Sequence, residues 1–493
     1  MDSFKKRRKL IVIGAGIGGM ATAAAMAHSG WDVTLVEQNE TAGGKMGRVE
    51  FDGCVFDTGP SLITMPFVFK DFFASCGKNF EKYVSLRALE PTCRYFWSDG
   101  TRFDAFSNGG GLLKEVKKVF PDDETAVEKY LCDSEKAYEG TKEIFLFNKF
   151  DGFKEFLKPK NLRLLPYLPV LRPHRTLHSL HKSFFKNKKL IQLFDRFATY
   201  NGSSPYKAPA TLSIISHVEL GLGAWYPDGG IYSIAKAFEK LCREMGVTIV
   251  FKTKVKSVLS ERNTATGVVL ESDKVLKADA VVSNVDVHWT RKYLLEKKNL
   301  REPEFSTSGF VILAVVKKKD RGLSHHNIIF SDNYKQEFDD LFKRKSAADD
   351  MTVYISRSSH SDRQMAAPDR ENWFILVNAP ANGGKTNYWK ENKEEYFKKV
   401  LKKMQSSGLD IRDDIISYRI MTPDDFKNDF SAMNGSIYGS ASNNALSAFM
   451  RPGNISEDIK NLFYVGGSTH PGGGVPLVVL SGGIVAKIID ESF

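Results

Sequence analysis

The residues most suited to chemistry are three glycines near the start of the chain, Gly14, Gly16 and Gly19, in the pattern G-x-G-x-x-G. Gly14 allows a tight turn, Gly16 lets the backbone approach a pyrophosphate, and Gly19 lets the following helix pack against a sheet. A helix that begins here presents free N–H groups and a partial positive charge to phosphates. Glu37 lies about 20 residues further on, where a carboxylate holds a ribose hydroxyl. This spacing predicts a dinucleotide-binding site.

A strand, a helix and a second strand must position these residues. Residues 10–13 are apolar and suit a strand buried on both faces, and an alanine-rich helix and a second strand at residues 33–36 follow. The same stretch has two other interpretations, a secretory signal peptide with residues 5–9 as its basic region, and a transmembrane segment. Neither explains three glycines at this spacing, and Thr22 and His28 interrupt the apolar run. We therefore favour the first unit of a Rossmann-like fold.

A second glycine loop favours FAD over NAD as the cofactor. Gly44 and Lys45 belong to a loop whose paired glycines and basic residues suit a phosphate, and a predicted β-hairpin follows it. A domain that binds only NAD has no need of this second loop, whereas FAD is held extended and its isoalloxazine lies far from the first turn. The turn at Gly59, Pro60 and Ser61 is assigned to the same cofactor site.

The C-terminal residues predict the other half of this site. Residues 461–465 form a predicted buried strand, which ends at a glycine loop that includes Gly467. A helix follows, with Val475, Pro476 and Leu477 in its first turn, a position that proline favours. The positive end of this helix can point at the pyrimidine edge of a reduced, anionic flavin. Both ends of the chain are therefore expected to build one cofactor site.

The domains are consequently predicted to be discontinuous in an α/β protein. The Rossmann-like FAD-binding domain is assigned to residues 1–90, 215–300 and 415–493, and within it Val255 is a candidate for backbone contact with the adenine. A mixed-sheet substrate-binding domain is assigned to residues 91–140 and 301–414. Residues 141–214 are assigned to a helical, membrane-facing cap.

Charge and composition limit the partners. The chain of 493 residues carries a formal charge of +11, and its five cysteines are scattered, which indicates a reducing compartment without a disulfide framework. Residues 149–196 hold twelve Lys or Arg against three Asp or Glu, interleaved with phenylalanines and leucines. Such a stretch suits an anionic bilayer surface, although a solvated helical cap with a buried apolar side fits equally well. No motif for nucleic-acid binding accompanies the charge, and no nucleic-acid partner is predicted.

A few titratable residues could act as ligands or proton carriers. His174, His178 and His181 share a helical face, but no acid or cysteine nearby in the sequence completes a ligand set, so no metal is predicted. Glu219 and His470 could handle a proton, but a structural role is the better interpretation for both. The catalytic side chains are therefore left unassigned.

These motifs together resemble the bacterial-type phytoene desaturase family, which comprises FAD-dependent carotenoid desaturases with related isomerases and oxygenases. Besides the N-terminal glycines, the resemblance rests on residues 43–45, 57–61, 204–211 and 469–476. It implies FAD, a long apolar polyene substrate, oxygen or a quinone as electron acceptor, and a cytoplasmic protein on the inner face of the cytoplasmic membrane. The tail and residues 371–374 resemble desaturases of diapocarotenoids or hydroxylated carotenoids more than four-step phytoene enzymes.

Desaturation removes a hydride from one carbon and a proton from its neighbour, and the flavin takes the hydride. The allylic π system shares the positive charge as the hydride leaves, so a strong base is not required. Three other functions remain open on the sequence. They are a carotenoid isomerase or oxygenase on the same scaffold, a non-catalytic prenyl-lipid carrier of the escort-protein type, and an amine oxidase. The intact glycine pattern with Glu37 argues against the carrier, and the phenylalanine-rich basic stretch fits a cationic amine poorly.

Overall fold

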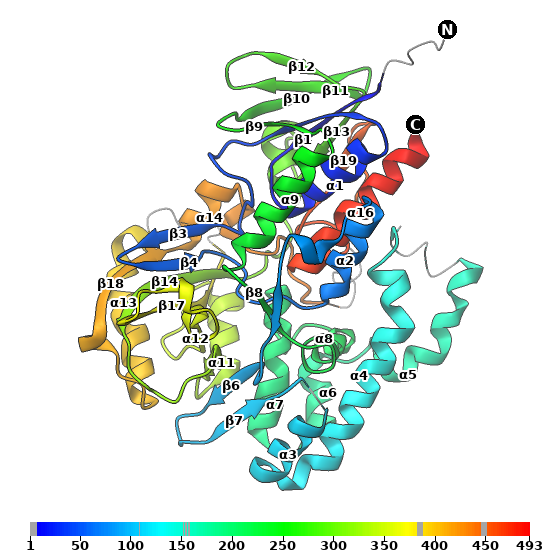
Figure 1. Cartoon of the computed structure of the whole chain (residues 1–493). Helices are drawn as coiled ribbons and strands as arrows, with labels where there is room; N and C mark the ends of the chain where they lie inside the picture. The colour runs from blue at the N-terminus through cyan, green and yellow to red at the C-terminus, as the bar shows by residue number, and fades with distance from the viewer. Residues whose placement is uncertain are drawn as a thin grey trace.

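The computed structural model describes residues 7–493 except positions 108, 151, 153, 154, 156, 157, 382–387 and 445–450. It contains a parallel sheet at the top of Figure 1, a mixed sheet at the left, and a group of helices at the lower right. This confirms the predicted α/β class with one parallel and one mixed sheet. Asp151, Phe153, Lys154, Phe156 and Leu157 of the predicted basic cap lie outside the described residues.

The parallel sheet has five strands drawn from three distant parts of the chain. In sheet order they are β19 (Leu462–Tyr464), β13 (Ala280–Ser283), β1 (Lys9–Ile13), β2 (Asp32–Val36) and β9 (Thr248–Val250). The central strand β1 has four of its five residues buried, as a strand covered on both faces requires. The N-terminal, middle and C-terminal segments thus share one sheet.

Helices from both ends of the chain pack together beside this sheet (Figure 1). Helix α1 (Ile17–His28) lies against α9 (Tyr232–Glu244) and α16 (Val475–Ser492), and α16 also contacts α2 (Pro66–Ser75). The contact between α1 and α16 is close, because a Cβ added at Gly482 would lie 2.5 Å from the Cβ of Ala21. A small antiparallel sheet, β10 (Val255–Glu261), β11 (Thr264–Leu270) and β12 (Val275–Lys277), adjoins this part.

The mixed sheet has seven strands. In order they are β18 (Ile415–Met421), β14 (Ser308–Lys317), β17 (Arg370–Ala379), β16 (Val353–Ser356), β15 (His326–Ile329), β6 (Cys93–Phe96) and β7 (Arg102–Ala105). Only the pairing of β15 with β6 is parallel among these described strands. In β14, Phe310 and Ile312 pack towards α13 (Tyr388–Ser406), whereas Val311 and Leu313 face α14 (Pro423–Phe430).

Two short ribbons connect the sheets. The predicted hairpin is confirmed as β3 (Arg48–Phe51) and β4 (Cys54–Asp57), and Asp52 and Gly53 at its turn both have positive φ, of 45° and 70°. Positive φ at both central residues is the requirement of a type I′ turn. The second ribbon pairs β5 (Leu86–Ala88) with β8 (Trp225–Pro227). Three short helices also belong to the described part: α10 (Val287–Trp289), α11 (Tyr334–Asp339) and α12 (Ser358–Ser361).

The helical group forms one core with the β6–β7 edge of the mixed sheet. Its helices are α3 (Gly109–Val119), α4 (Glu124–Phe145), α5 (Leu168–Leu171), α6 (Leu177–Phe184), α7 (Lys188–Asp195) and α8 (Ile214–Leu220). Tyr130 of α4 packs against Phe194 of α7, and Tyr95 of β6 stacks on Phe330.

Strand pairing and helix packing bear on two of the predicted boundaries. β18 pairs with β14 in the mixed sheet, so the predicted start of an FAD-binding segment at residue 415 is too early. Helix α8 packs against α4, but its Val218 also packs against the core that contains the parallel sheet, so residues 215–220 lie between the two parts. The pairing of β18 with β14 joins segments that are distant in sequence. The remaining domain limits stay a prediction.

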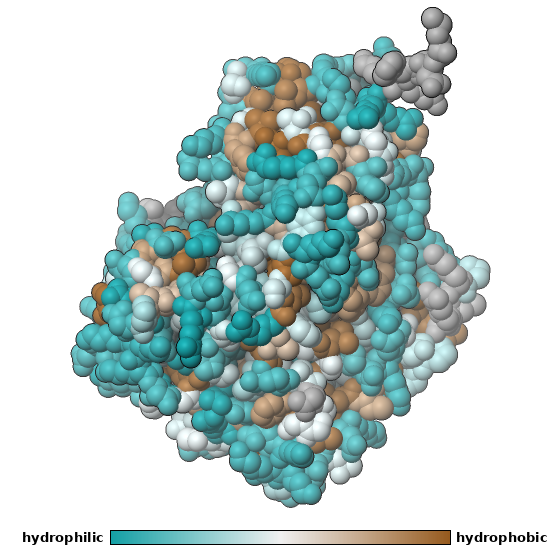
Figure 2. Space-filling model, viewed as in Figure 1, coloured by the Kyte–Doolittle hydropathy of each residue, from teal (hydrophilic) through white to brown (hydrophobic). Residues whose placement is uncertain are grey.

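The surface in Figure 2 is mostly hydrophilic, with hydrophobic residues in small groups. No helix within the described residues is long and apolar enough to cross a membrane. Leu165 and Leu168, at 58% and 44% exposure, are among the most exposed large hydrophobic residues.

The contact between α1 and α16 can be tested with two adjacent glycines. Gly482→Ala places a Cβ 2.5 Å from Ala21, and such overpacking costs about 1–3 kcal/mol of unfolding free energy. Gly483→Ala meets only Phe72 at 4.0 Å and should stabilise the helix by up to about 1 kcal/mol. Thermal and urea unfolding of the two variants should shift in opposite directions. Equal destabilisation would contradict this packing.

Candidate functional site

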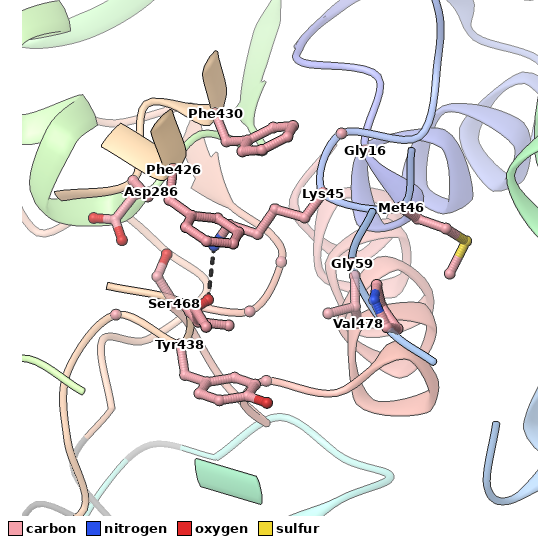
Figure 3. Close-up of a pocket in the computed structure, with 18 of the residues that line it drawn as sticks. Gly16, Lys45, Met46, Gly59, Asp286, Phe426, Phe430, Tyr438, Ser468 and Val478 are labelled. Carbon is pink, nitrogen blue, oxygen red and sulfur yellow. Dashed lines mark hydrogen bonds between the residues drawn. The ribbon is translucent and has the colours of Figure 1, made fainter. Parts of the chain in front are cut away.

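One cavity of about 670 Å³ is bordered by residues of both sheets. Figure 3 shows the N-terminal glycine loop with Gly16 and the side chain of Lys45 meeting Phe426 and Tyr438 from the C-terminal part of the chain. The turn between β1 and α1 borders one part of the cavity, and strands of the mixed sheet border another. The cavity therefore has two connected parts. We call the part at the glycine loops (Gly14, Gly16, Gly44 and Gly59) the cradle, and the part at strands β14, β15 and β17 of the mixed sheet the chamber.

Most of the predicted cofactor residues border this cavity. They are Gly14, Gly16, Glu37, Gly44, Lys45, Gly59, Pro60, Ser61, Val255, Gly467, Val475 and Pro476. Gly19 and Leu477 do not border it. A Cβ at Gly19 would lie 2.2 Å from the carbonyl oxygen of Gly14, so Gly19 serves the close packing of helix on turn. Contact of each bordering residue with a cofactor remains a prediction.

Glu37 connects the glycine turn after β1 with the loop after β2 through hydrogen bonds. Its Oε2 accepts a hydrogen bond of 2.7 Å from the Ala15 N–H, and its Oε1 accepts one of 2.9 Å from the Asn39 N–H. The side chain is buried at the end of β2. A carboxylate has about four lone-pair sites, so it can accept further hydrogen bonds from ribose hydroxyls.

The backbone around the cavity fits an extended dinucleotide. No side chain caps the first turn of α1 at Gly16 or of α16 at Gly474, so both helix starts keep free N–H groups for an anion. A Cβ at Gly16 would lie 2.5 Å from Nδ2 of Asn284, and one at Gly59 would lie 1.9 Å from the carbonyl oxygen of Lys45. These loops therefore lie too close together to admit side chains, as a backbone cradle for a pyrophosphate requires.

Lys45 extends across the cavity towards the C-terminal segment. Its Nζ donates a hydrogen bond of 2.7 Å to the carbonyl oxygen of Ile437 (Figure 3). Burial lowers the pKa of Lys45, and the nearby charge of Asp286 opposes this shift. Asp286 is itself fixed, because it accepts a hydrogen bond of 2.8 Å from the His288 N–H at the start of α10.

The part of the cavity within the mixed sheet is largely apolar. Its apolar lining includes Val311, Ile328, Phe374, Leu376, Phe426 and Phe430. These side chains come from β14, β15, β17 and α14, on the face of β14 opposite α13. A chamber with such walls can hold a hydrocarbon and keep water away from it.

Sequence reasoning predicted Ser61 but missed its polar neighbours, Tyr354 at the wall of this chamber and His326 behind it. Ser61 Oγ and Tyr354 Oη are 2.5 Å apart, and Tyr354 Oη lies 2.8 Å from Nδ1 of His326. Burial, with the nearby charge of Arg196, lowers the pKa of His326 to about 3, so the ring is neutral at physiological pH. Arg196 also borders the cavity, although the sequence placed it among surface basic residues. Its position in the apolar run around Phe194 and Phe197 was the available signal.

The structure assigns hydrogen-bonded positions to the other candidates. Glu219 is buried and accepts a hydrogen bond of 2.8 Å from Arg196, and His470 Nε2 donates one of 2.9 Å to the carbonyl oxygen of Asn148. His178 and His181 both bond to Asp195, at 2.6 and 2.7 Å. Across the described residues, no group of three potential metal ligands is close enough to hold an ion.

The sequence profile of the flavin containing amine oxidoreductases matches residues 17–490. This chain belongs to that family. A 1-hydroxycarotenoid 3,4-desaturase from a Flavobacterium species is 37% identical over 98% of this chain and 99% of its own. A 4,4'-diapolycopene oxygenase from a Methylomonas species is 34% identical over 98% of each chain. The cyclohexylamine oxidase of Brevibacterium oxydans shares the fold, with a TM-score of 0.60 and 13% identity over 99% of this chain and 100% of that one.

The protein is therefore an FAD-dependent oxidoreductase, and the FAD prediction is confirmed. The described residues fit this cofactor. The uncapped helix starts suit its phosphates, and Glu37 lies where the ribose of the adenosine half is expected.

The role of Glu37 can be tested against a nearby carboxylate. Glu37→Gln removes one acceptor from the cradle, and the FAD dissociation constant should rise roughly tenfold to hundredfold. Glu40→Gln is the matched control, because Glu40 pairs with Lys252 at the surface, with its side chain 76% exposed. Flavin bound per protein after gel filtration, with thermal unfolding as a check on folding, measures the effect. Equal flavin retention by the two folded variants would contradict the assignment.

Proposed function

We propose that the protein is a carotenoid desaturase that introduces C=C bonds into an acyclic polyene such as phytoene, diapophytoene or a hydroxylated carotene. The observation that carries this proposal is the apolar chamber that opens into the glycine-lined cradle. The carotenoid desaturase and oxygenase relatives, which match nearly the whole chain, support the same substrate class.

In this reaction the residues of the chain align the polyene, exclude water and accept the departing proton. Bound FAD supplies the two-electron oxidation. The apolar walls from β14, β17 and α14 align the polyene and exclude water. The departing proton needs only a weak acceptor, because the adjacent π system delocalises positive charge. The hydroxyl of Tyr354 can relay this proton, taking it up as it passes its own hydrogen to Nδ1 of the neutral His326 ring, 2.8 Å away. Oxygen or a quinone is the proposed final electron acceptor.

We further propose that the helical group docks on the inner face of the cytoplasmic membrane. Leu165 and Leu168 are exposed in a stretch where basic residues outnumber acidic ones twelve to three. Exposed leucines beside basic residues suit the interface of an anionic bilayer. A carotenoid dissolved in that bilayer would then be available to the enzyme.

The reaction is tested with purified protein, FAD and vesicles that contain an acyclic carotene. Under air or with an added quinone, the polyene absorption should move to longer wavelengths, and mass spectrometry should show the loss of two hydrogens per step. Gly16→Val is the control, because its side chain would collide with Asn284 in the cradle. An unchanged chromophore with a new oxygen atom would assign oxygenation instead, and a change in geometry alone would assign isomerisation.

Membrane docking is tested by flotation with vesicles of phosphatidylglycerol or phosphatidylcholine. The double variant Leu165→Glu, Leu168→Glu should bind anionic vesicles at least roughly tenfold more weakly, because burying one leucine contributes about 1.5–3 kcal/mol. Val275→Glu is the matched control, since Val275 is 46% exposed on β12 beside the parallel sheet. Equal flotation of both variants would place the docking surface elsewhere.

A further inference from the structure

Arg451 places a second cationic side chain, besides Lys45, where the N-terminal and C-terminal segments meet. Lys45 borders the cavity, and the charge of Asp286 acts on it. Nη1 of Arg451 donates hydrogen bonds of 3.0 Å to the carbonyl oxygens of Tyr438 and Gly467. Tyr438 and Gly467 both border the cavity. The guanidinium of Arg451 therefore lies directly behind residues that form the cavity wall.

No carboxylate offsets the charge of Arg451 within the described part of the chain. Burial lowers the pKa of its guanidinium to about 10, and the hydroxyl of Tyr438 opposes this shift. The guanidinium is therefore charged at neutral pH. The residue as a whole is only partly buried, but its Nη2 is buried and has no hydrogen-bond partner among the described residues. Residues 445–450, which precede Arg451 in the chain, contain no Asp or Glu.

An unpaired buried charge is costly, because it loses its hydration without gaining a counter-charge. Holding two carbonyl oxygens does not require a charge, since the amide group of a glutamine also has two N–H donors. Two other buried arginines differ from Arg451 in this respect, because Arg196 pairs with Glu219 and Arg357 pairs with Glu371. The unpaired charge becomes understandable if negative charge develops on the other side of the cavity wall.

The reactive ring of FAD is expected at the junction of the cradle and the chamber. The cofactor extends from the ribose site predicted at Glu37, and its ring has to reach a ligand in the chamber. Lys45 of the cradle donates a hydrogen bond to the carbonyl oxygen of Ile437, and Figure 3 shows Phe426 of the chamber wall next to this lysine. Tyr438 follows Ile437 in the chain, so the wall in front of Arg451 belongs to this junction.

Arg451 also lies close to the loop before α16. A Cβ built at Gly472 would lie 3.3 Å from Nε of Arg451, and α16 begins after Gly474 with no side chain capping it. The positive end of this helix and the charge of Arg451 are therefore on the same side of the cavity. The pyrimidine edge of the flavin was predicted to face this helix start.

A charge in this position acts on the oxidation state of the cofactor. A hydride carries two electrons and one proton, so the flavin that accepts it gains one negative charge. A fixed positive charge nearby, in a poorly hydrated wall, stabilises the reduced cofactor relative to the oxidised one. The effect is electrostatic and needs no contact between the guanidinium and the flavin.

We propose that Arg451 raises the reduction potential of bound FAD by placing an unpaired positive charge behind the flavin end of the cavity. Arg451 touches neither the substrate nor the reacting atoms, and it acts through its charge alone. This inference rests on the FAD assignment and on the predicted position of the flavin ring. It is independent of which compound the enzyme oxidises.

The test measures the midpoint potential of bound FAD by anaerobic reduction of the holoenzymes with a reference dye. Arg451→Gln removes the charge and keeps an N–H donor for the two carbonyl oxygens. The ratio of the affinities for reduced and oxidised FAD should fall roughly tenfold to hundredfold, which lowers the potential by about 30–60 mV for a two-electron couple. Arg451→Lys keeps the charge, and its potential should remain close to the wild-type value.

Arg291 offers a matched control, because Arg291→Gln removes the same unit of charge. Its Nε donates a hydrogen bond of 2.8 Å to Asp458, which is also 3.5 Å from Nζ of Lys297, so the carboxylate keeps a partner in the variant. Arg291 does not border the cavity. Since Asp458 offsets its charge, the midpoint potential of the Arg291 variant should equal that of the wild type.

Four outcomes would overturn the inference. They are a wild-type potential in Arg451→Gln, an equal fall in Arg451→Gln and Arg451→Lys, an equal fall in Arg451→Gln and Arg291→Gln, and loss of FAD from both neutral variants. The second neutral variant is Arg451→Met, which serves if the glutamine variant does not fold. Equal falls in the Gln and Lys variants would assign Arg451 to support of the loop, and loss of FAD would assign it to cofactor retention. No carotenoid takes part in this measurement, so failure of the desaturase proposal would leave its result unchanged.

Discussion

Five glycines surround the side chain of Asn284, and this arrangement determines how closely the loops of the predicted nucleotide site approach one another. Cβ atoms built at Gly16, Gly18 and Gly466 would lie 2.5 to 2.9 Å from it. Cβ atoms built at Gly14 and Gly19 would lie 3.7 and 3.0 Å from Asn284. The β1–α1 turn, the end of β13 and the end of β19 can meet only because none of these glycines carries a side chain. The uncapped helix starts and the buried Glu37 all depend on that meeting.

The mixed sheet supplies the apolar wall of the same cavity. β14 is buried on both faces, so its even-numbered residues hold α13 in place while Val311 faces the cavity. The glycine loops and the apolar side chains of β14 and β17 therefore border one continuous cavity. Arg196 borders that apolar chamber and is paired with the buried Glu219 behind it.

Much of the nucleotide half was predictable, because its signals are local. The glycine spacing, the turn at Asp52-Gly53 and the helix start at Pro476 each depend on residues that are neighbours in the chain. Errors occurred where partners are distant. Residues 415–421 were assigned to the FAD-binding domain, whereas β18 pairs with β14, about a hundred positions earlier in the chain. Leu477 does not border the cavity, and its contact with the cofactor stays a prediction. Arg196 was counted as a surface charge because its partner Glu219 lies on another helix.

The sequence by itself determined the cofactor class, since a tight glycine turn after a buried strand needs only φ freedom and close backbone approach, which residue types specify directly. It also indicated that the C-terminal glycine loop completes the site. Only the tertiary structure decided which charges are buried and what they contact. Burial is a property of every element packed around a residue, and a basic residue in the sequence looks the same whether water or a glutamate lies beside it. Arg196, paired with the buried Glu219, is the example in this chain.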